Sequence, residues 1–307
     1  MATLYTHARA NIRKTWLLVS LIFILIIVFF WVFSYVFQNP VILWFGVALA
    51  ILMNVVSYWY SDKIVLAISG AKPVDPKQNP ELHRIVENLA ITAGLPMPKL
   101  YLINDPAPNA FATGRDPKHA VVAVTSGLLE RLDRTELEGV LAHELSHIGN
   151  RDMLVSTIVV VLAGIIAIIS DMFLRMTWFG GIRSNDRDSR AGGILMAVAL
   201  IGAVLAPLAA MLIRLAVSRR REFLADASGA LLTRYPEGLA NALRKIAQDP
   251  RPLANAHTAT AHLFFENPFK ADVATPGQIR KIPWLVKIFM THPPIEDRIR
   301  ALQQMSV

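Results

Sequence analysis

Four long stretches without a charged residue constrain the fold of this chain more than any other feature. They cover residues 16–37, 41–60, 153–170 and 191–213. A helix of about 20 apolar residues crosses the ~30 Å hydrocarbon core of a bilayer, so each stretch is long enough, or nearly so, to span a membrane. The third stretch is the shortest. A soluble protein with buried helices is the alternative, but four such stretches in one chain favour an integral membrane protein with four transmembrane helices.

Basic residues near the ends of these stretches predict the orientation of the chain. Arg9, Arg13 and Lys14 precede the first stretch, and Arg219 to Arg221 follow the fourth. Because Lys and Arg gather on the cytoplasmic side of a membrane, both termini are expected to be cytoplasmic. Four arginines in the loop 171–190, which would then face the other side, do not fit this orientation. The first stretch is too long for a cleaved signal and no A-x-A site follows it, so we interpret it as a retained anchor.

Charge and cysteine content exclude some classes of function. The net charge of +8 fits basic segments that face an anionic leaflet, and no nucleic-acid-binding motif is present, so we expect no nucleic-acid partner. The chain has no cysteine. Disulfides are therefore excluded, and any zinc ligands must be histidines and carboxylates.

The apolar stretches divide the chain into four segments. We expect a transmembrane hairpin (1–61), a polar segment (62–152), a second transmembrane hairpin (153–213) and a polar tail (214–307). In the polar segment, hydrophobic periodicity and turn residues predict a helix over 80–93, strands over 98–103, 110–113 and 120–125, and a further helix that begins after a capping box at Asp133 and Glu136. In the tail they predict helices up to residue 233, over 235–248 and over 294–304.

The predicted helix after Asp133 carries His143-Glu144-Leu145-Ser146-His147. On a helix, residues four apart lie on one face, so the two imidazoles can bind one metal ion. Glu144 lies beside them, where it can take a proton from a water on the metal. This H-E-x-x-H pattern is typical of zinc metallopeptidases.

A catalytic zinc site usually has three protein ligands and a water, so a third ligand must come from elsewhere. Glu222 is our candidate, because the second hairpin returns the chain to the side of the membrane that carries His143 and His147. An alternative is that Glu222 caps a helix or pairs with the adjacent arginines. Asp226 lies four residues further on the same helical face and could receive the free N–H of a ligand histidine, but its spacing alone favours a solvent-exposed position. Arg298 is a candidate partner for a carboxylate such as that of Asp226.

Three ordered motifs together resemble the HtpX-type membrane zinc metalloproteases, relatives of the CAAX prenyl-protein endopeptidases. They are His143-Glu144-x-x-His147, Glu222-Phe-Leu-Ala-Asp226 and Thr291-His292-Pro293-Pro294. The resemblance covers nearly the whole chain. It implies a gluzincin-type site with one Zn²⁺ per chain on His143, His147 and Glu222, and with Glu144 as general base.

The resemblance also implies a fold and a cellular role. The fold is a mainly α integral membrane protein with a cytoplasmic α+β, zincin-like catalytic domain that carries a small β-sheet. The protein is expected in a bacterial-type inner (plasma) membrane, where it would cleave misfolded or damaged membrane proteins or other unfolded polypeptides. The sequence makes no prediction of an oligomeric state.

Two further parts of the site follow from the resemblance. The residues Asn109, Ala110, Phe111, Ala112 and Thr113 resemble the family's edge strand, to which an extended peptide could add by backbone pairing. His292 is the candidate for a second oxyanion donor, and a turn that starts the last helix explains it equally well.

Three other functions compete with this interpretation. A transporter with a structural zinc domain would need polar or charged groups inside its spans, and the four stretches contain no charge. A prenyl-protein processing enzyme of narrow specificity would be expected to have a larger bundle of transmembrane helices, whereas this chain has four apolar stretches. An inactive scaffold is disfavoured by the intact H-E-x-x-H motif.

Overall fold

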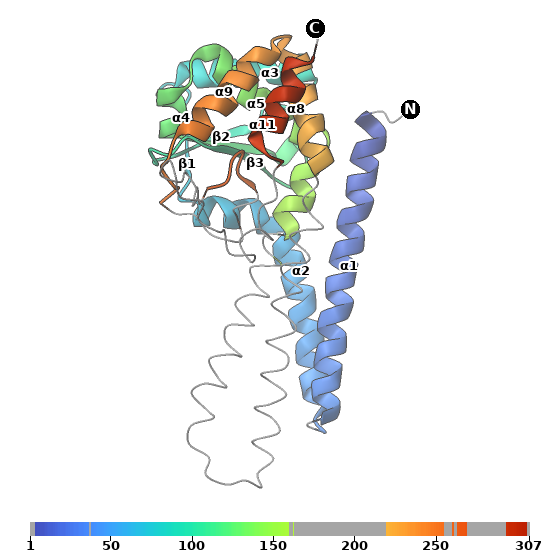
Figure 1. Cartoon of the computed structure of the whole chain (residues 1–307). Helices are drawn as coiled ribbons and strands as arrows, with labels where there is room; N and C mark the ends of the chain where they lie inside the picture. Colours follow the sequence, from blue (N-terminus) through green and yellow to red (C-terminus); the bar gives the residue numbers. More distant parts are fainter. Residues whose placement is uncertain are drawn as a thin grey trace, which may run out of the picture.

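A computed structural model describes residues 4–36, 38–159, 162, 219–254, 260, 263–268 and 293–305. Two long helices, α1 (Leu4–Val36) and α2 (Pro40–Ile68), lie side by side below a mixed α/β domain, and the N-terminal part of α1 rises beside that domain (Figure 1). The stretches Arg9–Tyr35 and Pro40–Ile68 are long and apolar enough to cross a membrane. Most of the third expected span and all of the fourth lie outside the described residues.

The turn between α1 and α2 is held by local polar contacts. Asn39 caps α2 by accepting a hydrogen bond from the backbone N–H of Val41 at 3.0 Å, and Pro40 occupies the first helical position, where its missing N–H costs nothing. The two helices approach closely at Gly46, where an added Cβ would overlap the side chain of Phe30. The first two apolar stretches therefore lie in two helices that pack side by side as a helical hairpin.

A four-stranded mixed sheet lies at the centre of the domain. Its strands are β1 (Lys72–Pro73), β2 (Lys99–Ile103), β3 (Ala110–Thr113) and β4 (Val121–Thr125), in the order β1-β2-β4-β3. β2 and β4 are parallel, with Lys99 opposite Val121, whereas β3 runs antiparallel to β4, with Ala110 opposite Val124. β3 is thus an edge strand of the sheet.

Both faces of the sheet are covered, which explains why β3 and β4 are fully buried. Leu100, Ala112 and Val122 belong to the larger core, which contains residues of the domain's helices. Tyr101, Phe111 and Ala123 point to the other face because side chains alternate along a strand. There they pack against Val65 and Leu66 at the end of α2 and against Leu253 and Phe264.

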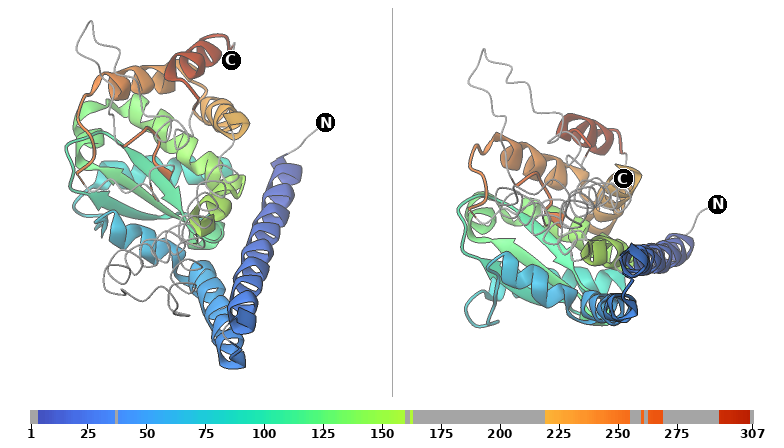
Figure 2. Two further views of the ribbon diagram at one scale, coloured as in Figure 1. Left: turned by 60° about the horizontal axis from the view of Figure 1, so that its bottom comes forward. Right: turned by 90° about the horizontal axis from the view of Figure 1, so that it is seen from below.

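The helices of the domain gather on the first of these faces (Figure 2). They are α3 (Pro80–Ala93), α4 (Ser126–Arg131), α5 (Arg134–Gly149), α8 (Arg219–Thr233), α9 (Pro236–Gln248) and α11 (Ile295–Gln303). α5 is central, since it contacts α3, α8, α9 and β3. The predicted helices and strands of the domain are all present, whereas α4, β1 and a short 3₁₀ turn were not expected.

Candidate active site

Helix α5 presents both histidines of the H-E-x-x-H motif toward one point. It starts with the expected capping box, in which Asp133 accepts from the backbone N–H of Glu136 at 3.0 Å and the Glu136 carboxylate accepts from the N–H of Asp133 at 2.9 Å. The helix is buried along most of its length, and His143 and Glu144 are only 1% and 2% exposed. Two buried polar side chains in a helix need specific partners.

Helix α8 brings Glu222 to the histidines because it packs very closely against α5. Glu222, Asp226 and Gly229 are spaced four and three residues apart, so they share one face of the helix. An added Cβ at Gly229 would lie 2.9 Å from the backbone nitrogen of His143. Glycine at this position therefore allows the backbones of the two helices to approach.

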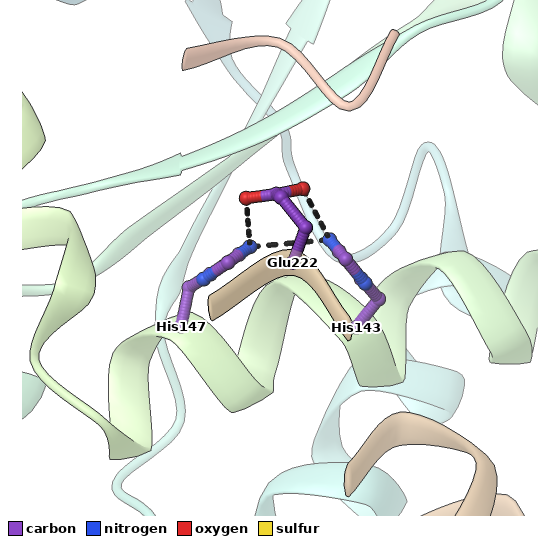
Figure 3. Close-up of side chains that lie close together, drawn as sticks. All are labelled: His143, His147 and Glu222. Carbon is purple, nitrogen blue, oxygen red and sulfur yellow. Dashed lines mark hydrogen bonds and ion pairs between the residues drawn. The ribbon is translucent and has the colours of Figure 1, made fainter. Parts of the chain in front are cut away.

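The three predicted ligands converge, as Figure 3 shows. The Nε2 atoms of His143 and His147 are 3.1 Å apart. Carboxylate oxygens of Glu222 lie 3.8 Å from the first Nε2 and 3.7 Å from the second. Ligands held about 2.0–2.1 Å from one tetrahedral zinc ion are about 3.3 Å from each other, so the spacing of these atoms suits a single metal ion.

The hydrogen bonds on the far side of each ring determine which nitrogen faces the centre of the site. Nδ1 of His143 lies 2.8 Å from Oδ1 of Asp226, and Nδ1 of His147 lies 3.3 Å from Oδ2 of Asp152. A carboxylate accepts hydrogen bonds, so each neutral ring carries its proton on Nδ1. Both Nε2 lone pairs therefore point at each other and at the Glu222 carboxylate, and such a set of acceptors is stabilised only by a cation.

The pKa values of the two histidines reflect the same electrostatics. Burial is the largest influence on His143 and lowers its pKa to about 4, although Asp226 opposes this shift. Burial also disfavours protonation of His147, but its hydrogen bond with Asp152 and the charges of Glu222 and Glu144 prevail and raise its pKa to about 9. Without a metal, the cluster thus attracts one positive charge as a proton.

A buried arginine supports the ring of His143 through Asp226. Arg298 of α11 donates from Nε and Nη2 to the two oxygens of Asp226 at 2.8 and 2.7 Å. Burial alone would raise the pKa of Asp226, but Arg298 outweighs it and holds the pKa at about 2. Asp226 is therefore a buried anion, not the solvent-exposed residue that its spacing favours, and Arg298 is its partner.

Asp152 is a site residue that sequence analysis missed. α5 ends at Gly149, and Arg151 adopts a left-handed conformation with φ of 56°, which is unfavourable for a non-glycine residue. The chain is redirected there, so that Asp152 points back to His147. The only signal in the sequence is an aspartate five residues after the motif.

The predicted edge strand borders the site, and one end of it is already paired. The backbone N–H of Phe265 donates to the carbonyl of Ala110 at 2.8 Å. The Asn109 side chain bonds both backbone groups of Glu266, accepting from its N–H at 3.1 Å and donating to its carbonyl at 2.9 Å. The ring of Phe265 stands edge-on to His143, with centroids 5.0 Å apart, so residues 263–267 form a wall of the site.

Ala112 and Thr113 continue β3, and Thr113 shares a hydrogen bond of 3.0 Å with Thr157. Glu144 is buried beside the two histidines. His292, the candidate oxyanion donor, lies outside the described residues.

A helical H-E-x-x-H motif with a glutamate from a second helix, in a domain joined to two long apolar helices, defines a membrane-anchored metallopeptidase. The chain belongs to peptidase family M48, whose family model matches residues 76–306. It is a metalloendopeptidase of this family, whose members depend on a metal. Its two long apolar helices and its similarity to HtpX homologs, described next, indicate a membrane protein.

Relatives of similar length support this assignment. The chain is 44% identical to a protease HtpX homolog of Caldanaerobacter subterraneus subsp. tengcongensis and 46% identical to one of Thermoanaerobacter pseudethanolicus, in each case over 99% of both chains. Among solved structures it is similar to S. mikatae Ste24p, with a TM-score of 0.50 and 19% identity. That match covers 89% of this chain and 61% of the other, and it shows a shared fold.

Proposed function

We propose that this protein is a zinc-dependent endopeptidase that cleaves misfolded or damaged membrane proteins, and other unfolded polypeptides, at segments exposed to the cytoplasm. One observation carries the proposal: three hydrogen-bond acceptors, on His143, His147 and Glu222, face one another at 3.1 to 3.8 Å. Two imidazoles and a carboxylate are a donor set that zinc prefers.

A zinc ion held by His143, His147 and Glu222 would supply a Lewis acid that polarises the scissile carbonyl and acidifies a water molecule. Glu144 is the general base. It follows His143 directly on α5 and is buried in the same site, so its carboxylate can accept a proton from the attacking water and deliver it to the leaving amine.

The outer edge of β3 is the proposed binding site for the substrate backbone. The carbonyl of Ala110 points away from β4, since it accepts from Phe265. Backbone groups alternate in direction along a strand, so those of Ala112 point to the same outer side. A peptide that pairs there is read mainly through its backbone, and this supports a broad specificity.

The placement of the domain supports substrates close to the membrane. Val65 and Leu66 at the end of α2 are buried beneath the sheet, so the domain lies directly at the end of the hairpin. The basic residues that flank the spans support a plasma-membrane protein with both termini and the active site on the cytoplasmic side.

The test is the Glu144→Gln variant of the full chain, purified in detergent and supplied with zinc. We expect it to retain one zinc ion per chain and to cleave an unfolded polypeptide at least about 100-fold more slowly. Glu138→Gln is a matched control on the same helix, because Glu138 pairs with Arg134 at 3.0 Å on the exposed side.

Each part of the proposal can fail separately. Wild-type cleavage by Glu144→Gln would refute the general-base role. A wild-type chain that cleaves equally well after chelation, or that binds no zinc, would refute the metal site.

A further inference from the structure

The membrane helix α1 contributes the polar side chain of Asn11 to the surroundings of the metal site. Asn11 is 9% exposed. Its Nδ2 donates to the carbonyl of Asn150 at 2.9 Å and to Oδ1 of Asp152 at 2.7 Å. Its Oδ1 accepts a hydrogen bond of 3.4 Å from Arg221. One amide thus connects three segments that are far apart in the sequence.

Two of these contacts lead directly to proposed metal ligands. Asp152 uses its other oxygen, Oδ2, to accept from Nδ1 of His147 at 3.3 Å. Arg221 immediately precedes Glu222 on α8, and its Nε lies 3.5 Å from Oδ1 of Asp152. Asn11 therefore holds the carboxylate that orients one ligand and touches the neighbour of another.

Apolar packing fixes α1 in this position. Leu18 and Ile22 of α1 pack against Leu154, Val155 and Ile158 in the residues that follow Asp152. These contacts place Asn11 about two helical turns before Leu18, on the same face of α1, where it meets Asn150 and Asp152 just after the end of α5. The apolar contacts of Leu18 and Ile22 do not involve the side-chain amide of Asn11. The hydrogen-bond partners of that amide are instead the residues around the metal site.

We propose that Asn11 is a positioning residue for the metal site, and that the N-terminal membrane helix thereby completes the support of His147. This inference rests on the proposed function, because it assumes that His147 binds zinc. Partners behind a metal-bound histidine fix the orientation of its ring and strengthen its binding. Removal of Asn11 takes away the 2.7 Å hydrogen bond to Oδ1 of Asp152 and leaves that oxygen with the longer, 3.5 Å contact to Arg221, so the carboxylate is held less firmly toward His147.

The test compares the zinc affinity of full-chain variants in detergent, measured by competition with a chromophoric chelator. Asp152→Ala is expected to weaken zinc binding 10- to 100-fold, and Asn11→Ala about tenfold, at the lower end of the range for such partners. Asn54→Ala is the matched control, because Asn54 is an asparagine of α2 that donates to the carbonyl of Ala50 in its own helix. It should leave the affinity unchanged.

Two further measurements separate positioning from a general loss of structure. The visible absorption of the Co²⁺-loaded protein should change in Asn11→Ala and not in Asn54→Ala, because it reports the geometry of the ligands. In the double variant with Asp152→Ala, Asn11→Ala should have no further effect on zinc affinity, since Asn11 acts through Asp152.

The outcomes distinguish this inference from the proposed function. A wild-type chain without zinc affinity would overturn both. A wild-type chain that binds zinc, with an unchanged affinity in Asn11→Ala or with fully additive effects in the double variant, would overturn the positioning role alone.

Discussion

The close packing of α8 on α5 makes Gly229→Ala an informative perturbation, because it adds a single methyl group behind the proposed metal ligands. The new Cβ would lie 2.9 Å from the backbone nitrogen of His143 and 3.2 Å from the carbonyl carbon of Ala142. Both are backbone atoms of α5, so no flexible side chain can move aside. The helices themselves must separate.

The size of this separation follows from the contact distance. Ordinary contact begins at 3.4 Å, so α8 must move by about 0.5 Å, whereas metal sites hold their ligand distances within about 0.2 Å. Glu222 lies two turns away on the same helix, and we expect zinc affinity to fall about 10- to 100-fold, as for other disturbed ligand supports. Overpacking costs about 1–3 kcal/mol and the better helix former returns about 1 kcal/mol, so the net loss of folding free energy should be at most about 2 kcal/mol.

The assay measures zinc affinity and the rate of cleavage of an unfolded polypeptide for Gly229→Ala and for Gly149→Ala. Gly149 is the control, since an added Cβ there would meet only Cδ1 of Leu95, at 3.9 Å. Wild-type zinc affinity and wild-type cleavage in Gly229→Ala would refute the conclusion that this glycine determines the position of Glu222.

Two other predictions concern buried ion pairs, and a third concerns the proposed metal site. Arg298→Met leaves the carboxylate of Asp226 buried without its arginine partner and should lower the free energy of unfolding by about 3–5 kcal/mol. Denaturant titration in detergent measures this change, and a loss under about 1 kcal/mol would contradict the prediction. The hydrogen bonds from Arg251 lower the pKa of buried Asp249 to about 2, below an unfolded value of about 3.9, so its contribution to stability is complete above about pH 4 and disappears as the pH falls toward 2. Asp249→Asn should therefore abolish the part of the pH dependence of unfolding that falls in this window, and an unchanged profile would count against the pair. Finally, zinc at 100 times its dissociation constant should stabilise the folded chain by about 2.7 kcal/mol, so a chelator should lower the thermal midpoint of the wild type but not of His147→Ala.

The sequence predicted those parts of the site that depend on local patterns. The capping box, the four-residue spacing of His143 and His147, and the alternation of residues 98–103, which include β2, each determine their structure within a few residues. Glu222 was predicted by a topological argument, and the structure brings it to the histidines.

The supporting residues could not be predicted because they depend on distant packing or on a single unusual backbone conformation. Asp152 reaches His147 only because Arg151 adopts a positive φ, which no propensity favours. Asn11 lies far along the chain from the histidines, and its partners are determined by how α1 packs. Arg298 is the exception, since it was a candidate partner for Asp226, although only the packing of α11 places it there. The pairing of Phe265 with Ala110 likewise joins a segment without regular secondary structure to β3.

The junction between α2 and the domain has a mechanical consequence. The helix is 29 residues long, about 44 Å at 1.5 Å per residue, and therefore exceeds a bilayer core of ~30 Å. Its last turns are part of the core beneath the sheet, and β1 pairs with β2 only a few residues later, so no hinge separates the hairpin from the catalytic domain. Long apolar helices change their tilt with the thickness of the lipid bilayer, and here such a tilt must turn the whole domain with it. A change of tilt in a bilayer of different thickness would therefore change the height and angle of the catalytic domain above the membrane.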